Sequence, residues 1–276
     1  MFYVYLVASA ALIPIINNFK NILRQPYSWY LVPLLFIGFF VGFVIIHAAV
    51  FAVWTLLVNV NKPQTKPAAC YRKTVTSTLR LAMKLARVKI HVSGAEKLPE
   101  NEHVMLVSNH IDDTDPAIFL AALPELELGF IAKKDVYTEM KFVAKAIHRL
   151  CGYPIDREHD REAAKTVIKA VSNIKNGLSG IGIFPEGKVS VTKELLPFRN
   201  GAFKIATRSG AKVVACTVWG TPKILKELFF RRTDIYLDIL AVVDPKDYEN
   251  TSDLGDHLYE IMKQKVDFYR NGELQS

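Results

Sequence analysis

The stretch Ser108-Asn109-His110-Ile111-Asp112-Asp113-Thr114-Asp115-Pro116 joins two apolar segments of different character. The segment before it, residues 103–107, has the length and apolar character of a short buried strand, and residues 116–123 have those of a helix. Proline is favoured in the first helical turn, and an aspartate just before it is a good helix N-cap. The sequence therefore predicts a tight strand-to-helix turn of an α/β fold, with His110 inside the turn and Asp115 at its far end.

This turn has two interpretations. A loop of this length can fold back, so that the Asp115 carboxylate accepts a hydrogen bond from one imidazole nitrogen of His110. The other nitrogen would then be a better base toward a substrate hydroxyl. The alternative is that Asp115 only caps a helix and His110 is only a polar turn residue. The turn by itself leaves both interpretations open.

Charge is distributed unevenly along the 276 residues, half of which are hydrophobic. Charged residues are absent before Lys20 and between Arg24 and Lys62, whereas the rest of the chain resembles an ordinary soluble α/β protein of one large or two small domains. The net charge of +8 suits an anionic membrane surface or anionic substrates. The cysteines lack a metal-ligand spacing and are typical of free thiols in a reducing compartment: Cys70, Cys151 and Cys216.

Residues 1–61 are predicted to be embedded in a membrane. Residues 30–58 are long and uncharged enough to cross a bilayer, whereas residues 1–16 are short for a full span. Whether both segments span, or form a shallow hairpin in one leaflet, stays open. A cluster of basic residues follows and predicts a cytoplasmic location for the next domain: Lys62, Lys66, Arg72, Lys73, Arg80, Lys84 and Arg87.

Residues 62–87 are predicted to be a basic linker helix, which could lie on the membrane surface or pack as an ordinary helix. From residue 88 to 276, strands and helices alternate. This pattern predicts an α/β domain with a mixed, largely parallel sheet flanked by helices. The expected strands cover 88–92, 103–108, 128–132, 153–155, 180–184, 212–219 and 235–243, and the expected helices 116–123, 135–150, 160–176, 201–209 and 253–270.

Two further turns carry polar residues where a strand is expected to end. Glu186-Gly187 follows the strand at 180–184, and Arg157 follows the strand at 153–155. Active sites of α/β sheets gather at strand ends, and an arginine there can bind a phosphate through two hydrogen bonds. The simpler alternatives are a surface turn for Glu186 and an ion pair for Arg157.

Four motifs occur in order: Asn109-His110-x4-Asp115, Gly152-Tyr153-Pro154-Ile155-Asp156-Arg157, Phe184-Pro185-Glu186-Gly187-x-x-Ser190, and Val213-Val214-Ala215-Cys216-Thr217-Val218. Together they resemble the four blocks of the glycerolipid acyltransferase family, most closely its bacterial 1-acylglycerol-3-phosphate acyltransferases. The segment 198–203 also resembles the family's basic-Gly-Ala-Phe helix start. The resemblance covers roughly residues 85–225.

The resemblance implies that an acyl thioester is attacked directly by the hydroxyl of a lysophosphatidic acid, giving phosphatidic acid. His110 would be the general base and Asp115 its orienting partner. Arg157 would bind the acceptor phosphate, while Glu186 and Gly187 would help to hold the glycerol backbone. The implied partners are a bilayer, a lipid substrate and acyl carrier protein or coenzyme A as acyl carrier, with no cofactor, metal site or nucleic acid.

The third motif departs from the family pattern. Where the family usually has Glu-Gly-Thr-Arg, this chain has Glu186-Gly187-Lys188-Val189, so the arginine is missing. Lys188 is expected to replace it in part. The first motif also carries extra acids at Asp112 and Asp113. Both departures leave open whether the acceptor is instead glycerol 3-phosphate or a phosphate-free lyso-lipid.

Two other classes of protein compete with the acyltransferase. A metal-dependent membrane hydrolase could use Asp112, Asp113 and Asp115 to hold a divalent ion, although the sequence offers no second acidic cluster with a histidine nearby. A non-enzymatic membrane adaptor would account for the basic helix but would leave the His110 and Glu186 motifs unexplained.

Overall fold

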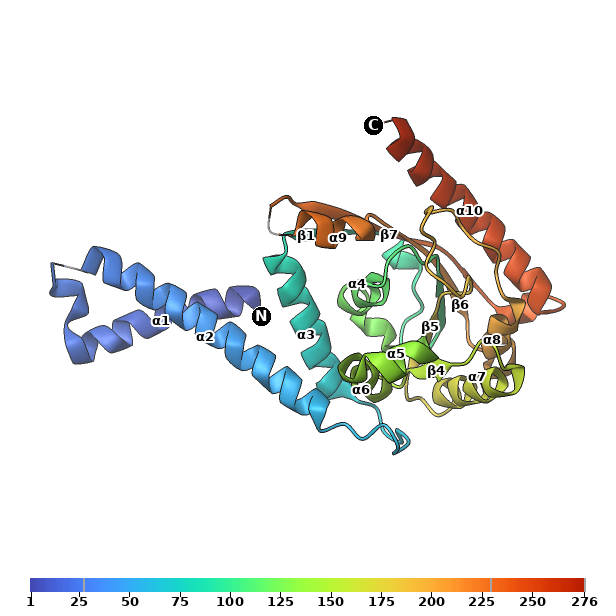
Figure 1. Cartoon of the computed structure of the whole chain (residues 1–276), viewed down its shortest axis with the longest axis horizontal. Coiled ribbons are helices and arrows are strands. Elements are labelled where there is room, and N and C mark those ends of the chain that lie inside the picture. The colour runs from blue at the N-terminus through green and yellow to red at the C-terminus, as the bar shows by residue number, and fades with distance from the viewer. Residues whose placement is uncertain (27, 229, 276) are drawn as a thin grey trace.

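A mixed sheet organises the chain after its N-terminal helices, in a computed structural model that describes residues 1–26, 28–228 and 230–275 (Figure 1). Over these residues the sheet has seven strands in the order β1-β7-β6-β2-β5-β3-β4. All neighbours are parallel except β6 and β7, which are antiparallel. The strands are β1 (Val88–Ser93), β2 (Met105–Ser108), β3 (Leu128–Lys133), β4 (Tyr153–Ile155), β5 (Gly180–Ile183), β6 (Val213–Trp219) and β7 (Thr233–Val243). The predicted fold class is confirmed.

The central strands are covered on both faces, which explains their continuous apolar sequences. Alternate residues of β2 enter two different cores: Met105 and Val107 pack on one side of the sheet, and Leu106 on the other. In β5, Gly182 is required by close packing, because a Cβ atom there would lie 2.4 Å from the ring of Phe130. The apolar pattern therefore sets the position of the sheet within the domain.

Helices cover each face of the sheet. On the face of Leu106, α4 (Asp115–Ala122) and α3 (Ala69–Leu85) contribute to the core. On the face of Met105, the core includes residues of α7 (Asp160–Lys175), α8 (Lys204–Ser209) and α10 (Thr251–Gln275). The described part of the domain also has these 3-10 turns: η2 (Ala95–Lys97), η3 (Pro124–Leu126), η4 (Asn200–Phe203), η5 (Thr221–Lys223) and η6 (Pro245–Asp247).

Three elements differ from the prediction. The helix expected over 135–150 is two helices, α5 (Lys134–Glu139) and α6 (Lys141–Arg149), because Met140 has non-helical angles of φ −111° and ψ 63°. No glycine or proline lies in this segment, so its local sequence does not signal the break. The helix expected from residue 201 starts as η4, and a short helix, α9 (Ile224–Glu227), was not predicted.

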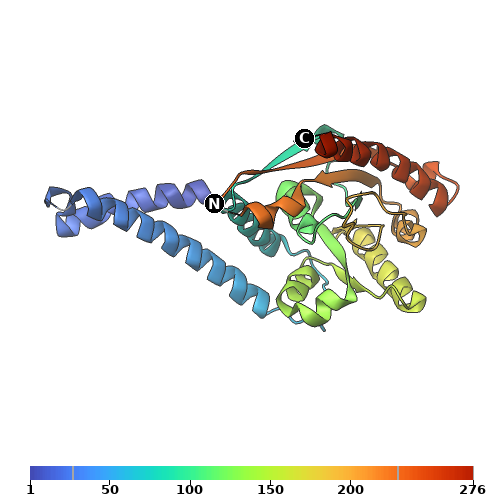
Figure 2. The same ribbon diagram turned by 45° about the horizontal axis from the view of Figure 1, so that its top comes forward.

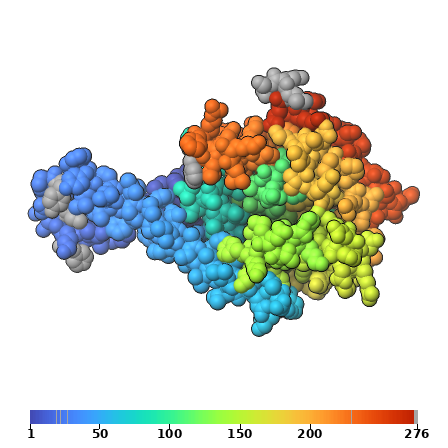
Figure 3. All heavy atoms as spheres, viewed as in Figure 1, coloured from blue at the N-terminus to red at the C-terminus, as the bar shows by residue number. Residues whose placement is uncertain are grey.

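The N-terminal helices form a hairpin that projects from the domain, on the side away from α7, α8 and α10 (Figures 1–3). It consists of α1 (Phe2–Lys20), η1 (Ile22–Arg24) and α2 (Ser28–Leu56). Among the described residues, α2 is the one helix long and apolar enough to cross a membrane. Its apolar side chains are largely exposed, which is unfavourable in water and suggests membrane anchoring.

The helix α3 connects this hairpin to the domain. Its buried Arg72 donates hydrogen bonds of 2.8 Å to the carbonyl oxygens of Leu128 and Leu150. The hydroxyl of Tyr71 pairs with Thr55 of α2 at 2.8 Å, and His47 of α2 pairs with Thr78 at 2.9 Å. Tyr71 and Val75 of α3 also pack with Leu150 of the domain, so α3 packs as an ordinary helix. The domain boundaries after residues 61 and 87 stay predictions.

Candidate active site

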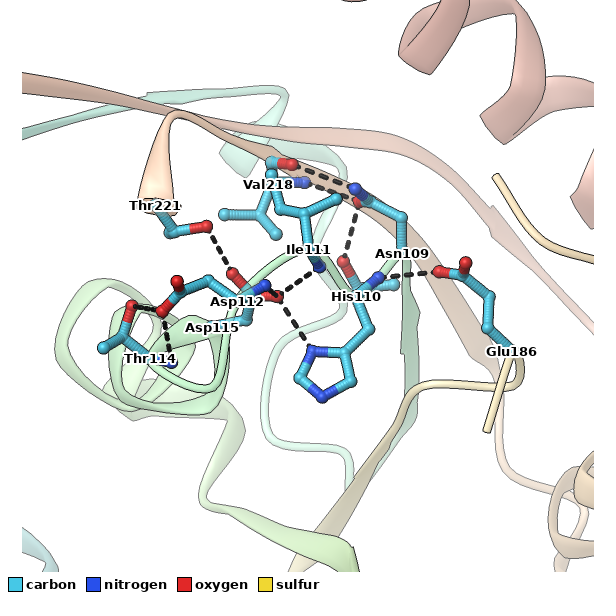
Figure 4. Close-up of polar contacts among 10 residues, drawn as sticks. Asn109, His110, Ile111, Asp112, Thr114, Asp115, Glu186, Val218 and Thr221 are labelled. Atoms are coloured by element: carbon cyan, nitrogen blue, oxygen red, sulfur yellow. Dashed lines mark hydrogen bonds and ion pairs between the residues drawn. The ribbon is translucent and has the colours of Figure 1, made fainter. Parts of the chain in front are cut away.

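The ends of three neighbouring strands bring the predicted turn together with two other loops. The strand order places β2 between β6 and β5, and all three run in the same direction. The loops that follow them therefore start at one edge of the sheet. They carry His110 after β2, Glu186 after β5 and Thr221 after β6 (Figure 4).

His110 and Asp115 are joined within the turn. Nδ1 of His110 lies 2.9 Å from Oδ2 of Asp115. The same oxygen accepts hydrogen bonds from the backbone N–H groups of Ile111 at 2.8 Å and Asp112 at 2.9 Å. This network assigns the proton to Nδ1, so Nε2 is left as an acceptor. Figure 4 shows Nε2 pointing away from Asp115.

The sequence predicted Asp115 as the N-cap of the helix, and this prediction is wrong: Asp115 closes the turn instead. The helix α4 begins at Asp115 itself, with Thr114 at the N-cap position. The carboxylate accepts from N–H groups that precede it in the chain, because the turn folds back over it. A fully buried carboxylate with such donors is held in one orientation, and it fixes the imidazole ring of His110.

Thr221 binds the other oxygen of the Asp115 carboxylate, a contact that the sequence did not predict. Its hydroxyl donates a 2.6 Å hydrogen bond to Oδ1 of Asp115. Thr221 lies two residues beyond the end of β6. The one feature that could have indicated this contact is the position of Thr221 after a strand parallel to β2. That feature becomes visible only when the order of the strands is known.

Asn109 fixes the start of the turn. Its side-chain amide donates to the carbonyl oxygen of Val218 at 3.0 Å and accepts from the N–H of Val218 at 2.8 Å. These paired bonds attach the last residue before His110 to the neighbouring strand β6. Asn109 is buried, so water does not compete for the bonds.

Glu186 acts on the backbone of the turn. One of its oxygens accepts from the N–H of His110 at 2.7 Å, and the other accepts from the N–H of Leu196 at 2.9 Å. Burial raises the pKa of Glu186 to about 7, although the two N–H donors act in the opposite direction. The ring of Phe184 stacks on the imidazole of His110, with centroids 4.1 Å apart. Glu186 is therefore a buried part of the site and not a surface turn residue.

A cavity of about 600 Å³ lies at the ends of β4 and β5. His110 does not line it, but Phe184, on which His110 stacks, does. The cavity combines apolar residues with four cationic side chains and one acid: Arg157, Arg199, Lys204, Arg208 and Asp160. Lys188 is exposed and is not among the lining residues.

Arg157 lines this cavity and does not pair with its neighbour Asp156. Asp156 pairs instead with Lys134 and His159, each at 3.1 Å. Within the described ranges, no ion pair of Arg157 is formed with Asp156, Glu158 or Asp160. Burial, followed by the nearby charge of Arg199, lowers the pKa of Arg157.

The three aspartates of the turn have separate roles. Oδ1 of Asp112 accepts from the N–H and the hydroxyl of Thr114, at 2.9 and 2.7 Å, while Asp113 is exposed. Asp115 is engaged as described above. In the part of the chain that the structure describes, no group of three or more His, Cys, Asp or Glu side chains is arranged to hold a metal ion.

A family model and named proteins similar to this chain all indicate an acyltransferase. Residues 89–219 match the family model described as Acyltransferase. The chain is 28% identical over 170 residues to the 1-acyl-sn-glycerol-3-phosphate acyltransferase of Borreliella burgdorferi, covering 60% of this chain and 66% of the relative. It is also 28% identical over 164 residues to the probable enzyme of that name from Mycoplasma pneumoniae, covering 58% and 60%. The matches thus span about two thirds of these relatives or less.

A solved structure shares the fold over nearly the whole chain. The crystal structure of the 1-acyl-sn-glycerophosphate (LPA) acyltransferase from Thermotoga maritima aligns with a TM-score of 0.60 at 24% identity. The alignment covers 92% of this chain and 98% of that one.

Proposed function

Because the α/β part of this chain belongs to the acyltransferase family, we propose that the protein transfers a fatty acyl group from a thioester to 1-acyl-sn-glycerol 3-phosphate. The product is phosphatidic acid. The observation that carries the proposal is the bond between Nδ1 of His110 and Asp115, which leaves Nε2 free to accept a proton beside a cationic cavity. The names of the relatives support this acceptor.

The proposed reaction needs no covalent intermediate. Nε2 of His110 accepts the proton of the acceptor hydroxyl while its oxygen attacks the thioester carbonyl carbon. A C–O bond forms, the tetrahedral intermediate collapses, and the C–S bond breaks. The imidazolium then returns its proton to the departing thiolate. Asp115 stabilises the imidazolium, and the sequence has no Gly-x-Ser-x-Gly motif for a serine nucleophile.

Other residues of the site are proposed to position these groups. Glu186 contributes through the backbone of His110, since both of its oxygens accept backbone N–H groups. Gly187 contributes through the turn that its φ of +79° permits. Direct contact of these two residues with the glycerol backbone, which the resemblance implies, stays a prediction. So does the role of Lys188 as a partial replacement for the missing arginine.

The location and the acyl donor are also part of the proposal. The hairpin of α1 and α2 would anchor the enzyme in the cell membrane, where its lipid substrate resides. The basic cluster after residue 58 favours the cytoplasmic side for the α/β domain. That side supplies acyl carrier protein or coenzyme A thioesters.

The test is a product analysis with purified protein in detergent. A labelled acyl thioester is offered with lysophosphatidic acid, glycerol 3-phosphate or monoacylglycerol, and the labelled lipid is identified. Phosphatidic acid is the expected product, and it should disappear with the His110→Ala variant. Labelled product from glycerol 3-phosphate or monoacylglycerol alone would reassign the acceptor. Release of free fatty acid that stops with EDTA would favour the metal-dependent hydrolase.

A further inference from the structure

The missing arginine of the third motif leaves Arg157 without the usual second guanidinium, since Val189 stands in its place. We infer that Arg199 is the second phosphate-binding guanidinium of this protein and works with Arg157 on the phosphate of the acceptor. This inference rests on the acyl transfer proposed above. It assigns Arg199, a residue outside that motif, to substrate binding.

The loop after β5 brings Arg199 back to the third motif. The N–H of Arg199 donates a 3.0 Å hydrogen bond to the carbonyl oxygen of Pro185, which fixes its backbone beside the Glu186-Gly187 turn. Its side chain lies directly over Gly187, because a Cβ atom on Gly187 would be 3.0 Å from Nε of Arg199. Gly187 thus makes room for the guanidinium as well as for the turn.

Arg157 and Arg199 line the same cavity, from different loops. Within the described residues, neither side chain forms an ion pair with an acid. Burial first, and then the charge of Arg199, lower the pKa of Arg157, so the two guanidinium groups of this cavity repel each other. Such a pair is unfavourable unless an anion lies between or beside the two groups. A phosphate monoester carries about two negative charges at neutral pH and accepts paired hydrogen bonds from arginine, so it fits this arrangement.

The neighbouring cations are less suited to this role. Lys188 is exposed and lies outside the cavity lining. Lys204 and Arg208 line the cavity from α8 and add positive charge, but the three atoms nearest to a Cβ on Gly187 all belong to Arg199. Arg199 is therefore the cation that links the cavity to the turn carrying Glu186.

Kinetics with two acceptors test the assignment. Arg199→Ala should lower kcat/KM for lysophosphatidic acid by about 10- to 150-fold, the loss expected for one hydrogen bond to a charged group. Slow transfer to monoacylglycerol, and the KM for the acyl thioester, should change little. Arg199→Lys should recover part of the loss, because it keeps the charge without the planar fork.

The matched control is Arg161→Ala, which removes one positive charge from an exposed position of α7 that does not line the cavity. It should leave the kinetics with both acceptors unchanged. Equal effects of the Arg199 and Arg161 variants would overturn the inference. A raised KM for the thioester, with kcat/KM for lysophosphatidic acid unaffected, would overturn it too, because the phosphate bound would be that of the donor.

A labelling experiment separates this inference from the proposed function. Phenylglyoxal modification of the wild-type protein, read by peptide mass spectrometry, should be slowed at Arg157 and Arg199 by glycerol 3-phosphate but not by glycerol, and unchanged at Arg161. Protection without transfer to lysophosphatidic acid would support the phosphate site and contradict the proposed reaction. Acylation of lysophosphatidic acid without protection of Arg199 would contradict Arg199 alone.

Discussion

Thr221 Oγ1 lies 2.6 Å from Oδ1 of Asp115, while the other carboxylate oxygen of Asp115 accepts from His110 (Figure 4). The two supporting residues follow neighbouring parallel strands, β6 and β2. The carboxylate is therefore held from both of its oxygens and is itself fully buried. This arrangement makes the orientation of His110 depend on a residue that lies more than a hundred positions away in the sequence.

Replacing Thr221 by valine should lower both the stability of the protein and its kcat, although the volume of the side chain stays nearly constant. The change leaves Oδ1 of a buried carboxylate without its donor, a loss of about 1–3 kcal/mol in the free energy of unfolding. We expect kcat to fall with it, because Asp115 would no longer be held in place. Steady-state kinetics and urea unfolding of the Thr221→Val and Thr221→Ser variants check this. The serine variant keeps the hydroxyl and should resemble wild type, so equal losses in both variants would contradict the role of the hydrogen bond.

Asp115→Asn should retain the fold but lower kcat by about 10²- to 10⁴-fold, the range associated with general-base catalysis. The amide oxygen can still accept from the turn, and its NH₂ group can donate to Thr221, whose hydroxyl can also accept. What is lost is the negative charge that stabilises the imidazolium of His110. The temperature of thermal unfolding should therefore stay close to that of wild type, whereas kcat should fall. A variant that is fully active, or that fails only because it is unfolded, would argue against this role of Asp115.

Glu186 should make stability depend on pH. Burial raises its pKa from 4.5 to about 7, so the folded protein holds this proton more tightly than the unfolded chain. The contribution of Glu186 to stability is then fully present below pH 4.5 and decreases as the pH rises toward 7. Unfolding of wild type and Glu186→Gln, measured from pH 4 to 8, should show the wild type losing stability relative to the variant. If the stability of wild type relative to Glu186→Gln stayed constant or increased with pH, the result would contradict the shifted pKa of Glu186.

The N-terminal hairpin should keep the protein in the membrane at high salt. Salt screens the attraction between basic residues and anionic lipids, but it does not weaken insertion of an uncharged helix such as α2. Membrane fractions washed with concentrated salt should therefore retain the full-length protein, and detergent should release it. Complete release by salt alone would show that α2 does not anchor the chain.

The sequence predicted those parts of the molecule that depend on residues close to one another along the chain. The turn between β2 and α4 has its two functional side chains within five residues, and the buried strands are continuous apolar segments, so both were predictable. The break at Met140 was not predicted, because it has no glycine or proline signal. The contact of Thr221 with Asp115 depends on strand order, which the pattern of elements did not define.

The cations near the third motif show that nearness in sequence and nearness in the fold can differ, while the role of Lys188 stays a prediction. Lys188 is adjacent in sequence to Val189, which stands where the family has an arginine. Adjacency does not determine direction: Gly187 has a φ of +79°, and after this turn Lys188 is exposed. Arg199 instead reaches Gly187 through a loop of twelve positions, a contact that only the folded chain defines.

The central claim is that Nε2 of His110 removes the proton of the acceptor hydroxyl, and His110→Ala tests it most directly. The measurement is the rate of phosphatidic acid formation from lysophosphatidic acid by this variant, with folding checked by circular dichroism. A general base contributes about 10²- to 10⁴-fold, so a folded variant should lose at least about 100-fold in kcat. A folded His110→Ala protein that keeps its rate within a few-fold of wild type would contradict the account.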